Sequence, residues 1–181
     1  MSLFDPNATP RIETERLILR GWRTDDFEHF AAMMADGEVA RFLTGNQRAM
    51  ARSEAWREMA LYVGHWALRG YGLFAVEEKA TGAFVGRIGA WQPEGWVGFE
   101  LGCALARPYW RRGYAYEGAR AAGDWIFATF PLDRIVSLIH ADNAPSQNLA
   151  RRLGMKAGDE TFHAGMVHHV WEVSRAEWSR A

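Results

Sequence analysis

The chain has 181 residues, of which 49% are hydrophobic and 24% charged, the proportions of a folded globular domain. Its 21 Lys and Arg residues against 22 Asp and Glu residues give a net charge of −1, which argues against a dedicated nucleic-acid or membrane-surface binder. The single cysteine, Cys103, excludes an internal disulfide and a multi-cysteine zinc site.

The N-terminal segment lacks the basic start and apolar stretch of a signal peptide, and no apolar run reaches the ~18 residues of a membrane helix. A cytoplasmic location is therefore expected. Residues 1–10, which contain Pro6 and Pro10, are predicted to be a loose lead-in. Residues 11–181 are predicted to form a single domain.

The first part of that domain is predicted to contain a strand followed by two helices. The strand covers residues 12–20, and Thr24 is the expected N-cap of a first helix that ends near Gly37. A second helix is expected over residues 49–68. Its predicted apolar stripe consists of Trp56, Met59, Ala60, Val63 and Ala67.

The remainder of the chain is predicted to alternate strands with helices. Strands are expected over 71–77, 83–91, 96–105, 134–140, 155–163 and 166–174, and helices over 114–130 and 145–153. The order β-α-α-β-β-β-α-β-α-β-β predicts an α/β (α+β) fold around a single mixed, mostly antiparallel sheet with helices on both faces. The strand–helix–strand unit over 96–140 predicts one parallel pair within it.

The turn before the predicted helix at residue 114 carries Arg111, Arg112 and Gly113. A helix N-terminus presents unpaired N–H groups and a partial positive charge, which favour phosphate binding. Glycine allows close approach of the backbone, and the arginines add positive charge. The turn is therefore a candidate pyrophosphate site, with an ordinary glycine turn and solvated arginines as the alternative.

Alternation along the strand at 96–105 separates two faces. The bulky face, which is expected to pack on helices, carries Val97, Phe99, Leu101, Cys103 and Leu105. The other face carries small residues and one carboxylate: Gly98, Glu100, Gly102 and Ala104. Small residues leave room for a ligand, and a lone acid there is either a functional base or the partner of an arginine.

The segment YWRRGYAYEGA over 109–119 resembles the acetyl-coenzyme A signature of the GNAT acetyltransferase superfamily, Q/R-x-x-G-x-G/A. Two further pieces, TERLILR over 14–20 and NAPS over 143–146 before RLGM over 152–155, resemble the branch that includes ribosomal-protein N-terminal acetyltransferases. The resemblance covers residues 11–175. It implies the GNAT fold, acetyl-CoA as cosubstrate, no metal, and transfer of an acetyl group to a primary amine.

The resemblance also implies a set of site residues. Amides of residues 111–116 would hold the pyrophosphate, and the strand at 100–105 would pair with the pantetheine arm where it splays from the strand at 134–140. The expected cofactor-binding residues are Gly102, Cys103, Ala104, Leu105, Arg111, Arg112, Gly113, Tyr114, Ala115, Tyr116, Asn143 and Ser146. Glu100 is the expected catalytic base, acting directly or through a water molecule, and Ser146 is the expected partner of the leaving sulfur.

Two departures from the family pattern are visible, and one alternative stays open. The Q/R position of the signature is Trp110, which should cost little because backbone amides supply most phosphate contacts. The position where many members carry a tyrosine is Ala150, so a tyrosine proton donor is absent there. Asn143 and Ser146 have the alternative role of capping the helix that Pro145 begins.

Other residues with reactive side chains are weaker candidates. The letters GYGLFA over 70–75 fit a dinucleotide motif but lead into a strand, so that interpretation fails. His163, His168 and His169 make a poor metal site, because adjacent strand residues point to opposite faces. Cys103 is expected to be a small buried hydrophobe rather than a nucleophile. His140 is a candidate secondary base.

The expected acceptor is the amine of a small molecule or a peptide N-terminus, and neither nucleic acid nor membrane is an expected partner. Because family members frequently dimerise, a homodimer is compatible with the resemblance. A non-catalytic CoA-binding or scaffold module is the first alternative function. A nucleotide-phosphate binder unrelated to CoA is the second.

Overall fold

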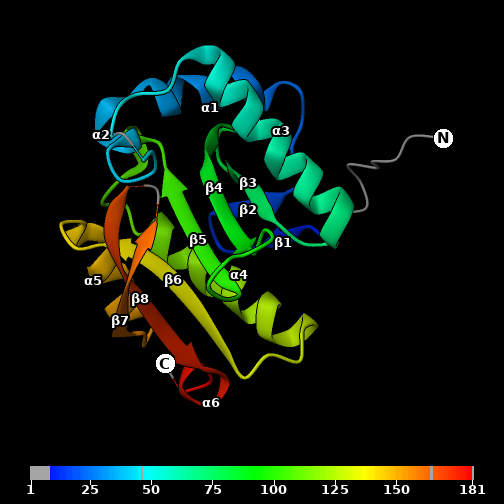
Figure 1. Cartoon of the computed structure of the whole chain (residues 1–181). Helices are drawn as coiled ribbons and strands as arrows, with labels where there is room; N and C mark the ends of the chain where they lie inside the picture. Colours follow the sequence, from blue (N-terminus) through cyan, green and yellow to red (C-terminus); the bar gives the residue numbers. More distant parts are fainter. Residues whose placement is uncertain (1–8, 46, 164, 181) are drawn as a thin grey trace.

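The computed structural model describes residues 9–45, 47–163 and 165–180. One sheet of eight strands, in the order β1-β2-β3-β4-β5-β6-β8-β7, runs through the described chain (Figure 1). Most of the predicted lead-in, residues 1–8, lies outside the described residues. None of the helices in these described ranges has the length and apolarity needed to cross a membrane.

The secondary-structure elements follow the predicted order closely. The strands are β1 (Ile12–Glu13), β2 (Leu17–Arg20), β3 (Leu73–Glu78), β4 (Phe84–Trp91), β5 (Glu100–Leu105), β6 (Arg134–His140), β7 (Lys156–His163) and β8 (Met166–Ser174). The helices are α1 (Asp26–Ala35), α2 (Gly37–Ala40), α3 (Arg52–Arg69), α4 (Tyr114–Thr129), α5 (Ala144–Arg152) and α6 (Arg175–Trp178), with a 3-10 turn over Arg107–Tyr109. The sequence did not predict α2, α6 or the 3-10 turn.

The sheet confirms the predicted mixed topology. Every neighbouring pair of strands is antiparallel except β5 and β6, which form the expected parallel pair. That parallel pair has a single point of register, Glu100 opposite Val136. Beyond this point β5 and β6 diverge, and the divergence creates the candidate site.

Helices cover both faces of the sheet, as predicted. Figure 1 shows α1 and α3 on one side of β3–β5 and α4 on the other. On the α4 side, a Cβ built on Gly118 would lie 2.5 Å from Cδ1 of Ile88, so a larger residue would force the end of that side chain to move. On the opposite side Tyr62 of α3, 1% exposed, packs into the core with Trp22 and Phe30.

The predicted stripe of α3 is correct at Met59 and otherwise wrong by a rotation of the helix. Its buried residues are Ala55, Met59, Tyr62, His65 and Trp66. Trp56 is 53% exposed and packs its ring edge against Phe27 instead. The stripe starting at residue 55 places the larger aromatic rings in the core, which buries more apolar surface.

Two predicted strands differ from the structure by more than two residues. The strand at 12–20 is interrupted after Glu13, because Thr14 turns the chain by a main-chain hydrogen bond to Leu17. The strand at 96–105 begins only at Glu100, because a turn in which the N–H of Trp96 donates to the carbonyl of Pro93 precedes it. The N-cap of α1 is Asp25 rather than Thr24.

Candidate active site

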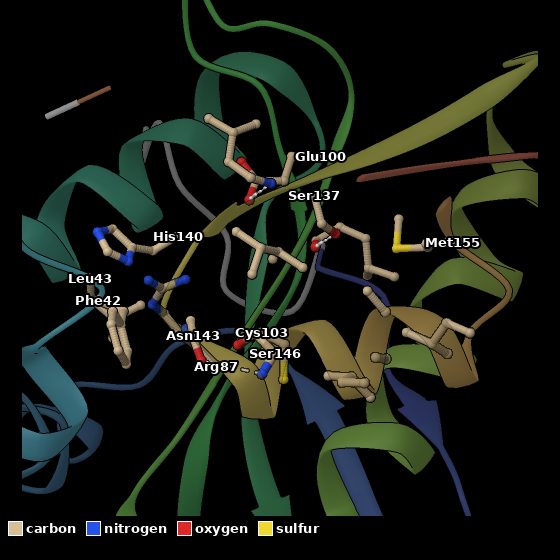
Figure 2. A pocket seen from close by; sticks show the side chains of 18 residues that line it. Phe42, Leu43, Arg87, Glu100, Cys103, Ser137, His140, Asn143, Ser146 and Met155 are labelled. Atoms are coloured by element: carbon tan, nitrogen blue, oxygen red, sulfur yellow. Dashed lines mark hydrogen bonds between the residues drawn. The ribbon is translucent and has the colours of Figure 1, made fainter. Parts of the chain in front are cut away.

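The point where β5 and β6 separate holds a cavity of about 110 Å³. Its walls come from β4, β5, β6, α5 and the segment after α2 (Figure 2). Among its lining residues are Arg87, Glu100, Cys103, His140 and Ser146. The volume suits the reacting ends of two substrates rather than whole molecules.

Glu100 lines this cavity at the single register point of the parallel pair. Nε1 of Trp96 donates to its Oε2 at 2.6 Å, and the N–H of Leu138 donates to its Oε1 at 3.4 Å. Burial raises the pKa of Glu100 to about 7, against the opposing effect of these two donors and of Arg87. A carboxyl group that gains and loses a proton near neutral pH is suited to general acid–base chemistry.

Ser146 and Asn143 also line the cavity, from the start of α5. Oδ1 of Asn143 accepts a hydrogen bond from the N–H of Ser146 at 3.2 Å, so Asn143 is the N-cap of α5. The capping alternative therefore holds for Asn143. The predicted contacts of Asn143 and Ser146 with a cosubstrate stay predictions.

The predicted pyrophosphate turn has unusual backbone geometry. Arg111 has φ 60° and Gly113 has φ 82°, so the chain enters the left-handed region twice just before α4. In the described residues, no main-chain N–H of residues 111–116 donates one of the hydrogen bonds that lie outside the regular helices and strands. Such a run of free N–H groups at a helix N-terminus can bind an anion.

This turn is held by residues that the sequence analysis did not assign to the site. Glu117, in the first turn of α4, accepts from Oγ1 of Thr14 at 2.6 Å and from the N–H and Nε of Arg16 at 2.7 Å each. Nη1 of Arg16 donates to the carbonyl of Arg112 at 3.0 Å. Thr14 and Arg16 belong to the TERLILR segment, so that segment fixes the turn before α4.

Two more predicted residues of the turn are positioned by neighbours. Tyr114 is buried, and its hydroxyl donates to Oε1 of Glu78 at 2.6 Å. Trp110, at the family's Q/R position, donates from Nε1 to the carbonyl of Leu105 at 2.7 Å. The indole therefore joins the turn to the end of β5. Ala115 and Tyr116 follow in the first turn of α4.

The four small or apolar residues predicted along β5 do not all reach the cavity. Gly102 and Cys103 line it. Ala104 and Leu105 are 8% and 6% exposed and are absent from its described lining. Among the described residues, the edge of β5 that faces β6 has no paired strand beyond the register point at Glu100, although Oγ of Ser137 donates to the carbonyl of Leu101 at 2.7 Å.

Cys103 was predicted on the core-packing face, and it also forms part of the cavity wall. Burial raises the pKa of its thiol to about 12. A thiol with this pKa is protonated at neutral pH and is therefore a poor nucleophile. This raised pKa agrees with the expectation from the sequence that Cys103 is a small hydrophobic residue rather than a nucleophile.

Three histidines lie close together, and one of them, His140, lines the cavity. The ring of His168 lies 5.7 Å from that of His140 and 5.9 Å from that of His163. His168 is buried, and burial lowers its pKa. In the described part of the chain, no group of three or more His, Cys, Asp or Glu side chains is arranged to hold a metal ion.

Two further residues act on the carboxyl of Glu100, and neither was assigned to this carboxyl from the sequence. Trp96 donates to Glu100, and Arg87 of β4 reaches the cavity across β5. Position alone gave no signal for Arg87, because an arginine in an alternating strand is typical of a solvent-facing residue. Trp96 lies in a turn, where its contact with Glu100 depends on chain geometry that sequence spacing does not reveal.

Comparisons with known proteins agree with this geometry. The family model of the acetyltransferase (GNAT) domain matches residues 16–156. The protein YkkB of Bacillus subtilis (strain 168) is 30% identical over 156 residues, which cover 82% of this chain and 87% of YkkB. The N-acetyltransferase p20 of Bacillus licheniformis is 27% identical over 79% of this chain and 80% of its own length.

Solved structures share the fold. An acetyltransferase from Agrobacterium tumefaciens str. C58 has a TM-score of 0.81 at 27% identity, covering 92% of this chain and 95% of that one. RimJ from Mycobacterium smegmatis, solved in complex with CoA-disulfide, has a TM-score of 0.72 at 17% identity, with 93% and 88% covered. Because the family model spans most of the sequence, the chain belongs to the GNAT acetyltransferase family.

Proposed function

We propose that the protein is an acetyl-CoA-dependent N-acetyltransferase, in which a primary amine attacks the thioester directly. The observation that carries this proposal is the environment of Glu100, a half-buried residue whose desolvated carboxyl has a pKa of about 7 where β5 and β6 separate. About half of such a carboxyl is ionised at neutral pH, so it can accept a proton from the acceptor. Family membership supports acetyl-CoA as the donor.

The cosubstrate is proposed to lie along one continuous path. The free amides of residues 111–116 would bind the pyrophosphate, with Arg111 and Arg112 adding positive charge. The pantetheine arm would pair with the unpartnered edge of β5, and the acetyl group would enter the cavity. Ser146 would donate a hydrogen bond to the sulfur.

The chemical step needs a neutral amine. The amine nitrogen forms a bond to the thioester carbon, and its proton passes to Glu100, directly or through water. The oxyanion would be met by an N–H group of β5. The carbon–sulfur bond then breaks, and the thiolate takes up a proton; because a thiol pKa is near 8.5, no strong acid is required.

The need for the base depends on the acceptor. A lysine side chain with a pKa near 10.4 is neutral in roughly one molecule in 2,500 at pH 7, whereas an α-amine is neutral in about a tenth. Small amines and peptide N-termini both fit the proposed reaction. Removing a general base of this kind commonly costs ~10²–10⁴ in rate.

Two measurements test the proposal. Acetyl-CoA at about 100 times its Kd should stabilise the fold by ~2.7 kcal/mol in a melting experiment, and an amine library should yield released thiol. Absence of a melting shift would overturn the proposal. A shift without thiol release from any amine would instead support a CoA-binding scaffold, and a larger shift with ATP would support a nucleotide binder.

A further inference from the structure

We propose that Arg87 binds a carboxylate of the acceptor, so that the preferred substrates are amines carrying a carboxylate close to the reacting nitrogen. This inference rests on the proposed function, because it assigns an acceptor class to the same cavity. It starts from a charge that the described structure leaves unpaired.

Arg87 reaches the cavity because its neighbour across the sheet is small. It lies on β4 opposite Ala104 of β5, on the same face as Gly102. A Cβ built on Gly102 would lie 3.8 Å from Nη1 of Arg87, an ordinary contact distance, so the guanidinium lies against this glycine. Figure 2 draws Arg87 among the side chains that surround the cavity, together with Glu100 and His140.

The guanidinium of Arg87 has no anionic partner among the described residues. Its Nε is buried without a hydrogen bond, and no carboxylate in the described chain lies within 4.0 Å of it. By contrast, the buried Arg20 is paired with Asp26 at 2.8 Å and with Glu77 at 2.7 Å. An arginine stays charged at any accessible pH, and a charge withdrawn from water calls for an anion.

Arg87 is also held in place for binding. Its guanidinium carbon lies 5.0 Å from the centroid of the Tyr62 ring, a cation–π contact. The hydroxyl of Tyr62 donates to Glu58 at 2.7 Å, which fixes the ring. A guanidinium stacked on a ring keeps its N–H edge free, and that edge matches the two oxygens of a carboxylate.

The cavity therefore presents a pair of complementary charges to an acceptor. Glu100 attracts an ammonium group, whereas Arg87 repels it. A simple monoamine satisfies only Glu100, but an amine with a nearby carboxylate satisfies both. The carboxylate could be the α-carboxylate of a free amino acid or the side chain of an N-terminal Asp or Glu in a peptide.

Matched acceptor pairs test this assignment. Free amino acids are compared with their amides, and dipeptide amides beginning with Asp or Glu with those beginning with Asn or Gln. In the wild type, the carboxylate member of at least one set should have a kcat/KM at least about tenfold higher. Arg87→Gln should lower that value by about 10- to 100-fold and leave the uncharged member within about threefold.

The control is Arg134→Gln, which removes the same charge from an exposed arginine at the opposite end of β6 from His140 and should change neither member. Equal loss for both members in Arg87→Gln, or no preference in the wild type, would overturn the inference. If no acceptor reacts, the melting temperature of the CoA complex is measured with each carboxylate-bearing acceptor. A rise in the wild type that Arg87→Gln abolishes supports the inference, and no rise in the wild type overturns it. Failure of the proposed function is distinct, because acetyl-CoA would then produce neither a melting shift nor thiol with any amine.

Discussion

Glu100 and Glu117 lie at the two ends of one strand–turn–helix segment, and their environments move their pKa values in opposite directions. At Glu100 burial dominates and raises the pKa to about 7. Burial also acts to raise the pKa of Glu117, but hydrogen bonds from Thr14 and Arg16 outweigh it and lower the pKa. The comparison separates a carboxylate that holds the fold from one that is available for chemistry.

The same contrast applies to the arginines beside these acids. Arg16 is paired with Glu117 at 2.7 Å and braces the turn before α4. Arg87 acts on the charge of Glu100 from a distance without forming an ion pair within the described chain. At the turn the two opposite charges pair with each other, whereas in the cavity Glu100 and Arg87 form no ion pair among the described residues.

The largest expected effect is on turnover at the cavity. Glu100→Gln should lower kcat/KM by ~10²–10⁴, because the base is lost while the shape is kept. The wild-type kcat/KM should fall as pH drops through about 7, where Glu100 becomes protonated, and this limb should vanish in the variant. The acetyl-CoA melting shift should persist. An unchanged kcat/KM in steady-state assays would remove Glu100 from the reaction.

The next prediction concerns the stability of the same variant: Glu100→Gln should lower activity but raise the free energy of unfolding. The pKa of Glu100 is 4.5 ordinarily and about 7 in the fold, so the folded state binds more protons between these values. The contribution of Glu100 to the free energy of unfolding is most favourable below pH 4.5 and is lost as pH rises through 7. Above pH 7, Glu100→Gln should therefore be more stable than wild type by up to about 3 kcal/mol in denaturant unfolding.

The control for that measurement is Glu94→Gln, since Glu94 is almost fully exposed. Its unfolding free energy should follow that of the wild type at every pH. A Glu100→Gln variant whose advantage does not grow between pH 4.5 and 7 would show that Glu100 is not desolvated in solution.

A smaller loss of stability is expected at the turn. Glu117→Gln weakens the bonds to Thr14 and Arg16 and should cost about 1–3 kcal/mol of unfolding free energy. Because Arg16 also holds the carbonyl of Arg112, the KM for acetyl-CoA should rise. Glu13→Gln, at an exposed acid, is the matched control. A normal KM in a destabilised Glu117→Gln would limit Glu117 to a structural role.

Much of the fold could be predicted because its signals are local. The strands at 134–140 and 166–174 and the start of the helix at 114 match the structure to the residue, since breakers bound each pattern. The split of the first strand was missed because the alternating pattern of residues 12–20 gives no sign of the turn from Thr14 to Leu17, which a hydrogen bond from Thr14 to the distant Glu117 also holds. The α3 stripe was missed because two neighbouring faces are almost equally apolar.

The site residues also divide into those that local sequence identifies and those that only the folded chain identifies. Glu100 and the turn at 111–113 could be chosen from alternation and motif, because both depend on positions within one segment. The pKa of Glu100 depends on burial beneath β6 and on Trp96, which only the folded chain brings together. Arg87 could not be chosen, because the absence of an ion-pair partner for it among the described residues depends on how several elements surround the cavity.

The smallest expected effect concerns the other titratable group beside Glu100. The thiol of Cys103 lines the same cavity, and its raised pKa of about 12 leaves it protonated at neutral pH. A protonated thiol is a poor nucleophile, so we expect the amine to attack the thioester directly, without an acetylated enzyme intermediate. Cys103→Ala should keep kcat/KM within about threefold of wild type, since only one buried sulfur is lost. Intact-protein mass spectrometry with acetyl-CoA alone should detect no acetylated wild-type enzyme. The contrary result would be a stable acetyl adduct on the wild-type enzyme that is absent from Cys103→Ala, together with a large loss of turnover in that variant. It would show that the acetyl group passes through the thiol of Cys103 in a two-step reaction, and that this thiol, rather than Glu100, is the reactive group of the cavity.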